Sequence, residues 1–194
     1  MKKFLAIALA LVVLVSLAAC TGGTKLTPYE GDISTIIGSI YETVKPEFMV
    51  ADAMPVDLAD PWALNSYLGL GNPEEAETAT DGNVDAALIK EAYFSEPFIN
   101  AQAYSLVIAR ANDINKVEEI KTAMFEGINT RKWLCVGADQ LRVVSYGDVI
   151  MLVMASVPGL VDSIVQEFAA TVSASQLTGG DILGELTGEI LSRG

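Results

Sequence analysis

Leu-Arg-Val-Val-Ser-Tyr-Gly-Asp-Val-Ile-Met-Leu-Val-Met-Ala, residues 141–155, is the stretch that decides the fold. Two apolar, β-rich segments flank the Gly147-Asp148 pair, and this pattern is typical of a β-hairpin with a tight turn. Residues 87–94 and 104–111 form two further strand-like segments upstream. We therefore expect two strand pairs in one antiparallel sheet.

A helix is expected after each strand pair. Between residues 114 and 128, apolar side chains recur at the spacing of one helix face, and Asn112, Asp113 or Asn115 can cap the first turn. Pro158 opens the second helix. The order ββαββα predicts an α+β fold, a two-layer sandwich in which the helices cover one face of an antiparallel sheet.

Shorter helices are expected ahead of these elements. Asp32 can cap a helix that ends before Pro46, because the residue before a proline leaves the helical region. Asp60 followed by Pro61 is a second helix start. A chain of this length favours one domain, which we place at residues 32–175.

The first residues have the three parts of a secretory signal. Lys2 and Lys3 give a positive start, an apolar run follows over residues 4–15, and small residues come next. This stretch is shorter than the roughly 20 residues that span a hydrocarbon core, which disfavours a permanent transmembrane helix. We expect residues 1–19 to be a signal peptide and residues 20–31, rich in Gly and Thr, to be a flexible tether.

Leu17-Ala18-Ala19-Cys20, directly after the apolar run, resembles the lipobox of bacterial lipoproteins. The resemblance implies that the Cys20 sulfur carries diacylglycerol and that Cys20 is the first residue of the mature chain. Two long acyl chains anchor a protein firmly, since each buried methylene contributes about 0.8 kcal/mol. The expected location is the extracytoplasmic face of the cell membrane. The alternative is an ordinary signal peptide with a cysteine nearby by chance.

Several short motifs lie between residues 67 and 168. They are Tyr67-Leu68-Gly69-Leu70, Arg110-Ala111-Asn112-Asp113, Val117-Glu118-Glu119-Ile120-Lys121, Arg131, Tyr146-Gly147-Asp148-Val149 and Glu167-Phe168. Together they resemble an uncharacterised family of bacterial lipoproteins, domain of unknown function 4358. Tyr104-Ser105 stand where the family pattern leads us to expect a Glu, so any role of that acid is not carried over. The resemblance implies a lipid-anchored domain and supplies neither a reaction nor a binding residue.

The composition is strongly acidic and lacks histidine. Asp and Glu total 25 against 12 for Lys and Arg, giving a formal net charge of −13. A protein that binds duplex nucleic acid needs a basic face, so we expect no nucleic-acid partner. Ser–His–acid triads, histidine general bases and two-histidine zinc sites are excluded as well. We expect no catalytic residue, no cofactor and no metal, and we expect the charge to favour a basic protein partner in the envelope.

Three groups of side chains have structural interpretations. Cys135 lies in an apolar stretch and is expected to be a small buried side chain. Arg131 and Lys132 follow the helix expected to end near residue 128, where cations stabilise the negative end of the helix dipole. Trp62 and Tyr67 are expected to be aromatics of the core or its rim, with stacking on a sugar as the alternative.

Two segments are polar or rich in glycine. Residues 72–85 are expected to form an acidic loop, in which Asp81-Gly82-Asn83-Val84-Asp85 copies only the first positions of a calcium-binding loop, and calcium binding stays open. Residues 176–194 contain several glycines and predict a weakly ordered C-terminal tail with at most a weak helix.

The expected function is a non-enzymatic, lipid-anchored module for binding or envelope interaction. One alternative is a carboxylate-dependent envelope hydrolase, for which Glu91 with Glu96, or Asp57 with Asp60, would form the pair of acids. The other alternative is a solute-binding accessory of a transporter, which a single small domain fits less well.

Overall fold

The computed structural model describes residues 27–71, 87–99, 101–173 and 190–193. The expected signal peptide 1–19, the lipidation site Cys20, the acidic loop 72–85 and most of the tail 176–194 lie outside these ranges. The helices within the described ranges are all too short or too polar to span a bilayer.

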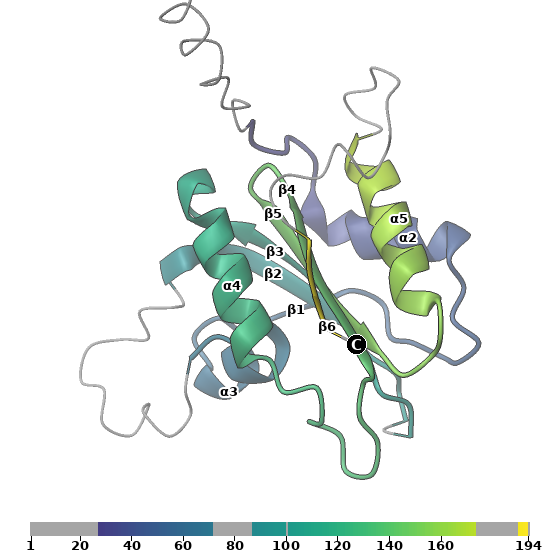
Figure 1. The fold of residues 1–194 in the computed structure, drawn as a ribbon. Coiled ribbons are helices and arrows are strands. Elements are labelled where there is room, and N and C mark those ends of the chain that lie inside the picture. The colour runs from purple at the N-terminus through teal and green to yellow at the C-terminus, as the bar shows by residue number, and fades with distance from the viewer. Residues whose placement is uncertain (1–26, 72–86, 100, 174–189, 194) are drawn as a thin grey trace, which may run out of the picture.

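A six-stranded sheet forms the centre of the fold (Figure 1). The strands lie in the order β1-β2-β3-β5-β4-β6, and all neighbours are antiparallel. Their bounds are β1 Met54–Pro55, β2 Ile89–Ser95, β3 Tyr104–Ala111, β4 Gln140–Tyr146, β5 Val149–Ala155 and β6 Leu191–Arg193. The expected hairpin is confirmed, since β4 and β5 are joined at Gly147-Asp148, where Gly147 has a positive φ of 57°.

Within the described residues, four helices accompany the sheet, and the α+β class is confirmed. They are α2 Ile36–Thr43, α3 Pro61–Ala63, α4 Val117–Gly127 and α5 Leu160–Ser173. A 3-10 turn leads into α2 and another into α4, and a π-helical turn, Leu64–Leu68, follows α3.

Aspartates set the starts of the first three helical segments, as the sequence predicts. The side chain of Asp32 accepts a hydrogen bond from the amide of Ser34 at 2.9 Å. Asp60 accepts from the amide of Trp62 at the same distance. Among the candidate caps Asn112, Asp113 and Asn115, Asp113 caps the helical segment after β3 by accepting from the amide of Asn115. Each cap satisfies an amide that has no partner within the first helical turn.

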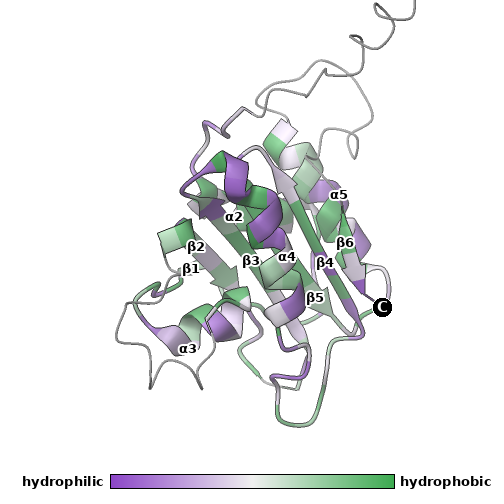
Figure 2. Ribbon diagram, turned by 60° about the vertical axis from the view of Figure 1, so that its left-hand side comes forward, coloured by the Kyte–Doolittle hydropathy of each residue, from purple (hydrophilic) through white to green (hydrophobic). Residues whose placement is uncertain are grey.

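Helices cover both faces of the sheet, which corrects the expected two-layer arrangement to three layers. α4 and α3 pack with one hydrophobic core, and α2 and α5 pack with a second core on the opposite face. Successive side chains of a strand point to opposite faces, so Val107 enters the first core and Leu106 the second. Every residue of β3 and β5 is buried, because both strands lie between two helical layers, and β5 is a continuous apolar run. Figure 2 colours the central strands mainly as hydrophobic.

The last described segment adds a strand that the sequence pattern does not predict. β6 pairs with β4 along Leu141, Arg142 and Val143, which places it at one edge of the sheet. A strand of three residues is too short to show the alternation of apolar and polar side chains from which strands are predicted.

Candidate functional site

A buried cation lies at the end of the sheet that carries the hairpin turn. Glu91 of β2 pairs in register with Arg110 of β3, and Arg110 pairs with Val149 of β5. Asp148 directly precedes Val149 in the turn, so the strand register brings two carboxylates to one guanidinium. Arg110 is 8% exposed.

The guanidinium also holds the chain that leads into the domain. Arg110 Nε lies 3.0 Å from Glu91 Oε1, and Nη1 lies 3.1 Å from Asp148 Oδ2. Nη1 donates to the carbonyl of Tyr29 at 2.7 Å, and Nη2 donates to the carbonyl of Gly31 at 2.6 Å. The amide of Tyr29 in turn donates to Asp148 Oδ1 at 2.7 Å. We call Glu91, Arg110, Asp148 and the backbone of residues 29–31 the Arg110 cluster.

The side chain of Tyr29 packs against the same end of the sheet. It is buried, and its ring meets the ring of Tyr146 edge to face at 6.3 Å. Gly147 allows this packing, because a Cβ at that position would clash with the carbonyl oxygen of Thr27. Residues 29–31, the C-terminal end of the expected tether 20–31, are therefore held against the sheet.

Three loops meet at the opposite end of the sheet. Tyr104 and Gln140, the first residues of β3 and β4, both pair with Ala155, the last residue of β5. The loops that lead into β3 and β4 therefore lie at this end, and a bridge between Val50 and Pro97 adds a third segment. We call residues 45–52, 96–99, 101–103 and 128–139 the loop end. Arg110 is six residues further along β3 than Tyr104, so the Arg110 cluster is about 20 Å away.

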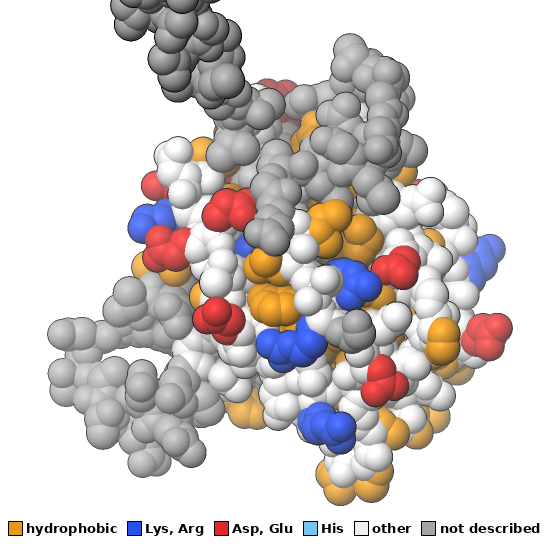
Figure 3. All heavy atoms as spheres, viewed as in Figure 1, with side chains coloured by type: hydrophobic (Ala, Val, Ile, Leu, Met, Phe, Trp, Pro, Cys, Tyr) orange, Lys and Arg blue, Asp and Glu red, His pale blue; other side chains and the backbone are white. Residues whose placement is uncertain are grey.

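Large hydrophobic side chains are exposed at the loop end. The exposed fractions are 76% for Met49, 67% for Phe98, 73% for Ile99 and 94% for Leu134. Figure 3 shows hydrophobic side chains at the lower tip of the molecule, the end remote from the hairpin turn. Single exposed apolar residues are ordinary, and the presence of several at one end makes that end a candidate contact surface.

An ion pair between Lys132 and Glu96 links two of these loops near their exposed apolar residues. Lys132 Nζ lies 2.5 Å from Glu96 Oε1, and it donates to the carbonyl of Ser66 at 2.8 Å. Burial lowers the pKa of Lys132, and the carboxylate of Glu96 opposes that shift. The expected role of Lys132 as a helix-end charge is wrong, because α4 ends at Gly127 and the ammonium turns to Glu96 instead. Arg131 is exposed.

Aromatic rings line the same ion pair. Tyr67 stacks on Phe94 with ring centres 3.8 Å apart, and Trp62 meets Tyr67 edge to face at 5.9 Å. Lys132 Nζ lies 4.8 Å from the centre of the Tyr67 ring and 5.4 Å from that of Trp133. Trp62 is mostly exposed and Tyr67 is half-buried, so both are rim aromatics.

Cys135 is exposed, which contradicts the expected burial. It lies beyond α4 in the loop before β4, and of the apolar stretch around it only Trp133 is buried. The stretch has no helix or strand to turn it toward the core, and its apolar composition therefore does not lead to burial.

Each carboxylate of the candidate acid pairs is bound by another partner. Glu91 pairs with Arg110 and Glu96 pairs with Lys132, and these cations lie at opposite ends of the sheet. Asp57 and Asp60 each accept a hydrogen bond from a backbone amide two residues further on. In the described ranges, acidic and cysteine side chains form no group of three or more arranged to hold a metal.

The hydroxyl of Ser105 lies beside Lys132, at 3.4 Å from Nζ. A serine with a neighbouring lysine is a familiar nucleophile and base. Ser105 is fully buried, however, and Lys132 is paired with Glu96. The geometry therefore fits a structural bond within the core better than an open reactive site.

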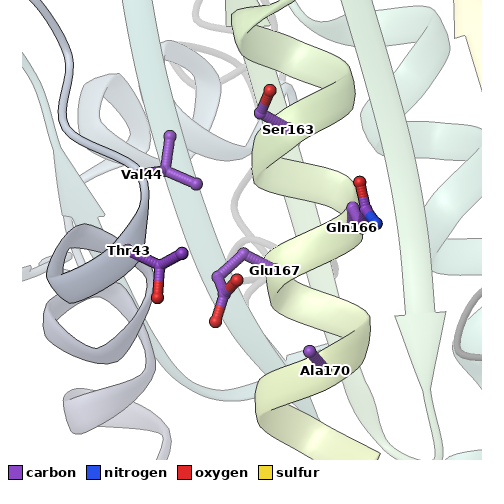
Figure 4. Close-up of a pocket in the computed structure, with 6 residues that line it drawn as sticks. All are labelled: Thr43, Val44, Ser163, Gln166, Glu167 and Ala170. Atoms are coloured by element: carbon purple, nitrogen blue, oxygen red, sulfur yellow. The ribbon is translucent and has the colours of Figure 1, made fainter.

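A surface groove of about 450 Å³ runs between α2 and α5 (Figure 4). It is lined by Thr43, Val44, Ser163, Gln166, Glu167 and Ala170. Glu167 is the charged member of this lining. A single carboxylate gives no paired acid and base for catalysis.

Comparison with protein-family models, with curated proteins and with solved structures finds no match to this chain. The resemblance to the lipoprotein family therefore stays a prediction from the motifs. The motifs around Arg110 and Tyr146–Val149 do meet in the fold, where they form much of the Arg110 cluster.

Proposed function

We propose that this chain is a lipoprotein, held on the extracytoplasmic face of the cell membrane by diacylglyceryl-Cys20, whose domain binds another protein and catalyses no reaction. The observation that carries the proposal is the separation of the Arg110 cluster from the loop end. The chain that follows the proposed anchor is fixed at one end of the sheet, and the exposed apolar side chains lie at the other.

The length between the anchor and the cluster supports this arrangement. Eight residues, 21–28, separate Cys20 from Tyr29, and eight extended residues reach at most about 28 Å. Tyr29 then stays within about 28 Å of the bilayer, and the loop end is the end of the sheet further from the anchored chain. A domain held in this way presents its apolar surface to the envelope.

The charge of the chain supports a basic protein as the partner. A net charge of −13 attracts cationic proteins over distances of about a Debye length and repels anionic lipid headgroups. The same charge disfavours nucleic acid as a ligand. The carboxylates at the candidate acid pairs are held by cations and backbone amides, which supports binding over hydrolysis.

The anchor is tested by the Cys20→Ser variant in cells fed an alkyne analogue of palmitate. We expect the wild-type chain to incorporate the label and to sediment with membranes, because the Cys20 thioether carries the lipid. The matched control is Cys135→Ser, which leaves labelling and sedimentation unchanged. Continued labelling of the Cys20→Ser variant, or loss of labelling in Cys135→Ser, would contradict the anchor.

A further inference from the structure

We propose that the loop end is the docking face of the domain and that its occupant is a basic protein with an apolar contact surface. This inference rests on the proposed function and assigns a surface and a partner chemistry to it. The side chains that make the contact are Met49, Phe98, Ile99 and Leu134.

The exposed side chains are mounted on loops that are already fixed. The Glu96–Lys132 ion pair holds the bases of the loops that carry Phe98 and Leu134. The loop of Met49 is held by the bridge between Val50 and Pro97. The preceding residue, Phe48, packs its ring against the buried Tyr104 at 5.3 Å. Pre-organised loops lose little conformational freedom on binding, so their apolar contacts contribute more to affinity.

Charge at the loop end is nearly balanced, in contrast to the whole chain. Its exposed ionic side chains are the cations Lys45 and Arg131 and the anions Glu47, Asp52 and Asp139. The strongly negative field therefore arises elsewhere on the protein. We expect that field to speed the encounter with a basic partner, while apolar contacts at the loop end set the lifetime of the complex.

The other occupants of an apolar surface fit less well. An anionic bilayer surface is repelled by the net charge of −13. A second copy would bring together two chains that each carry a net charge of −13. Neither objection applies to a basic protein.

The test uses the full lipidated chain in phosphatidylcholine nanodiscs, with empty nanodiscs as the reference. The probe is a fluorescent amphipathic helical peptide of leucine and lysine, compared with its leucine and glutamate counterpart. We expect the basic peptide to bind. Phe98→Asp or Leu134→Asp should weaken this binding about tenfold, since each removes an apolar contact that becomes buried only in the complex. Ile190→Asp, at an exposed apolar residue on the sheet edge, is the control and leaves affinity unchanged.

The dependence of the binding rates on salt separates the electrostatic contribution from that of the apolar contacts. Added salt slows association of the basic peptide and leaves its dissociation rate nearly constant, whereas Leu134→Asp raises the dissociation rate. Equal loss in the loop-end variants and in Ile190→Asp, or tighter binding of the acidic peptide, would overturn the proposal. Near-ultraviolet circular dichroism checks that each variant is folded, and Phe98→Ser and Leu134→Ser replace any variant that is not.

The remaining occupants have their own readouts. If Leu134→Asp abolishes binding to added phosphatidylglycerol vesicles and spares the peptide, the loop end is a lipid-binding surface. If it converts a dimer to a monomer in sedimentation, the occupant is a second copy. Either result rejects the basic partner. Release from membranes by Cys20→Ser is scored separately, so the anchor and the docking face can fail independently.

Discussion

Arg110 Nη1 lies 3.1 Å from Asp148 Oδ2, and both residues also bond the backbone of Tyr29. Asp148 accepts from the Tyr29 amide and Arg110 donates to the Tyr29 carbonyl. The pair therefore binds both the amide and the carbonyl of Tyr29, which lies in the segment that leads into the domain. If Cys20 carries the proposed anchor, this contact sets which end of the domain lies nearer to the anchor.

Replacing Arg110 by Met is expected to lower the free energy of unfolding by about 3–5 kcal/mol, because Asp148 and Glu91 would lose the cation between them. Chemical denaturation measures the change. Lys116→Met breaks the exposed pair with Glu119 and is the control, expected to leave the midpoint nearly unchanged. Equal midpoints for the two variants would contradict the importance of the Arg110 cluster.

Gly147→Ala is expected to destabilise the domain by about 1–3 kcal/mol, since Gly147 has a positive φ and a Cβ would meet the carbonyl of Thr27. The variant should also release residues 27–31, which limited proteolysis detects. Gly38→Ala in α2 is the control. Its Cβ meets no atom within 4 Å, and alanine there should stabilise by about 0.5–1 kcal/mol. A protease-resistant Gly147→Ala protein would show that the turn tolerates a side chain.

Stability is expected to fall as the pH rises above 10. Burial raises the pKa of Tyr104 well above 10.0 and raises that of Tyr41, which is hydrogen-bonded to it at 2.7 Å. Above pH 10 the unfolded chain loses protons that the folded chain keeps, so unfolding is favoured by up to about 1.4 kcal/mol per pH unit for each tyrosine. Denaturation over this pH range measures the slope.

Tyr104→Phe should make the fall of the unfolding free energy with pH less steep by the contribution of about one proton, which is up to about 1.4 kcal/mol per pH unit. Lys132 acts in the opposite sense, because its lowered pKa makes the folded chain bind fewer protons as the pH approaches 10.5, so its contribution rises with pH. The difference between wild type and Tyr104→Phe cancels the lysine contribution. An unchanged slope in Tyr104→Phe would assign the alkaline transition to other groups.

Local signals in the sequence predicted much of the fold. The strand 104–111 has the predicted bounds, and Asp32, Asp60 and Asp113 cap the helical segments as short-range chemistry requires. The unbroken apolar run of β5 also indicates that both sheet faces are covered, in contrast to the expected two-layer arrangement. An alternating strand would have matched that preference, whereas a continuous run indicates burial on two sides.

The contacts of the candidate site depend on register and could not be predicted in the same way. Arg110 and Asp148 are 38 residues apart, and only the pairing of β3 with β5 brings them together. Glu96 and Lys132 meet through two loops, whose paths no periodicity describes. The exposure of Cys135 follows from that same loop path, since apolar composition predicts burial only where an element directs the side chain inward.

The orientation of the anchored domain is the central claim, and energy transfer to a bilayer tests it most directly. Cys135 is exposed at the loop end, and in the lipidated chain the Cys20 thiol is blocked, so a donor dye can be attached to Cys135. A second donor site is Glu30→Cys in a Cys135→Ser background, beside the Arg110 cluster. With acceptor lipids in the headgroup layer, we predict stronger transfer from position 30 than from position 135. Equal transfer, or stronger transfer from position 135, would contradict the proposed orientation.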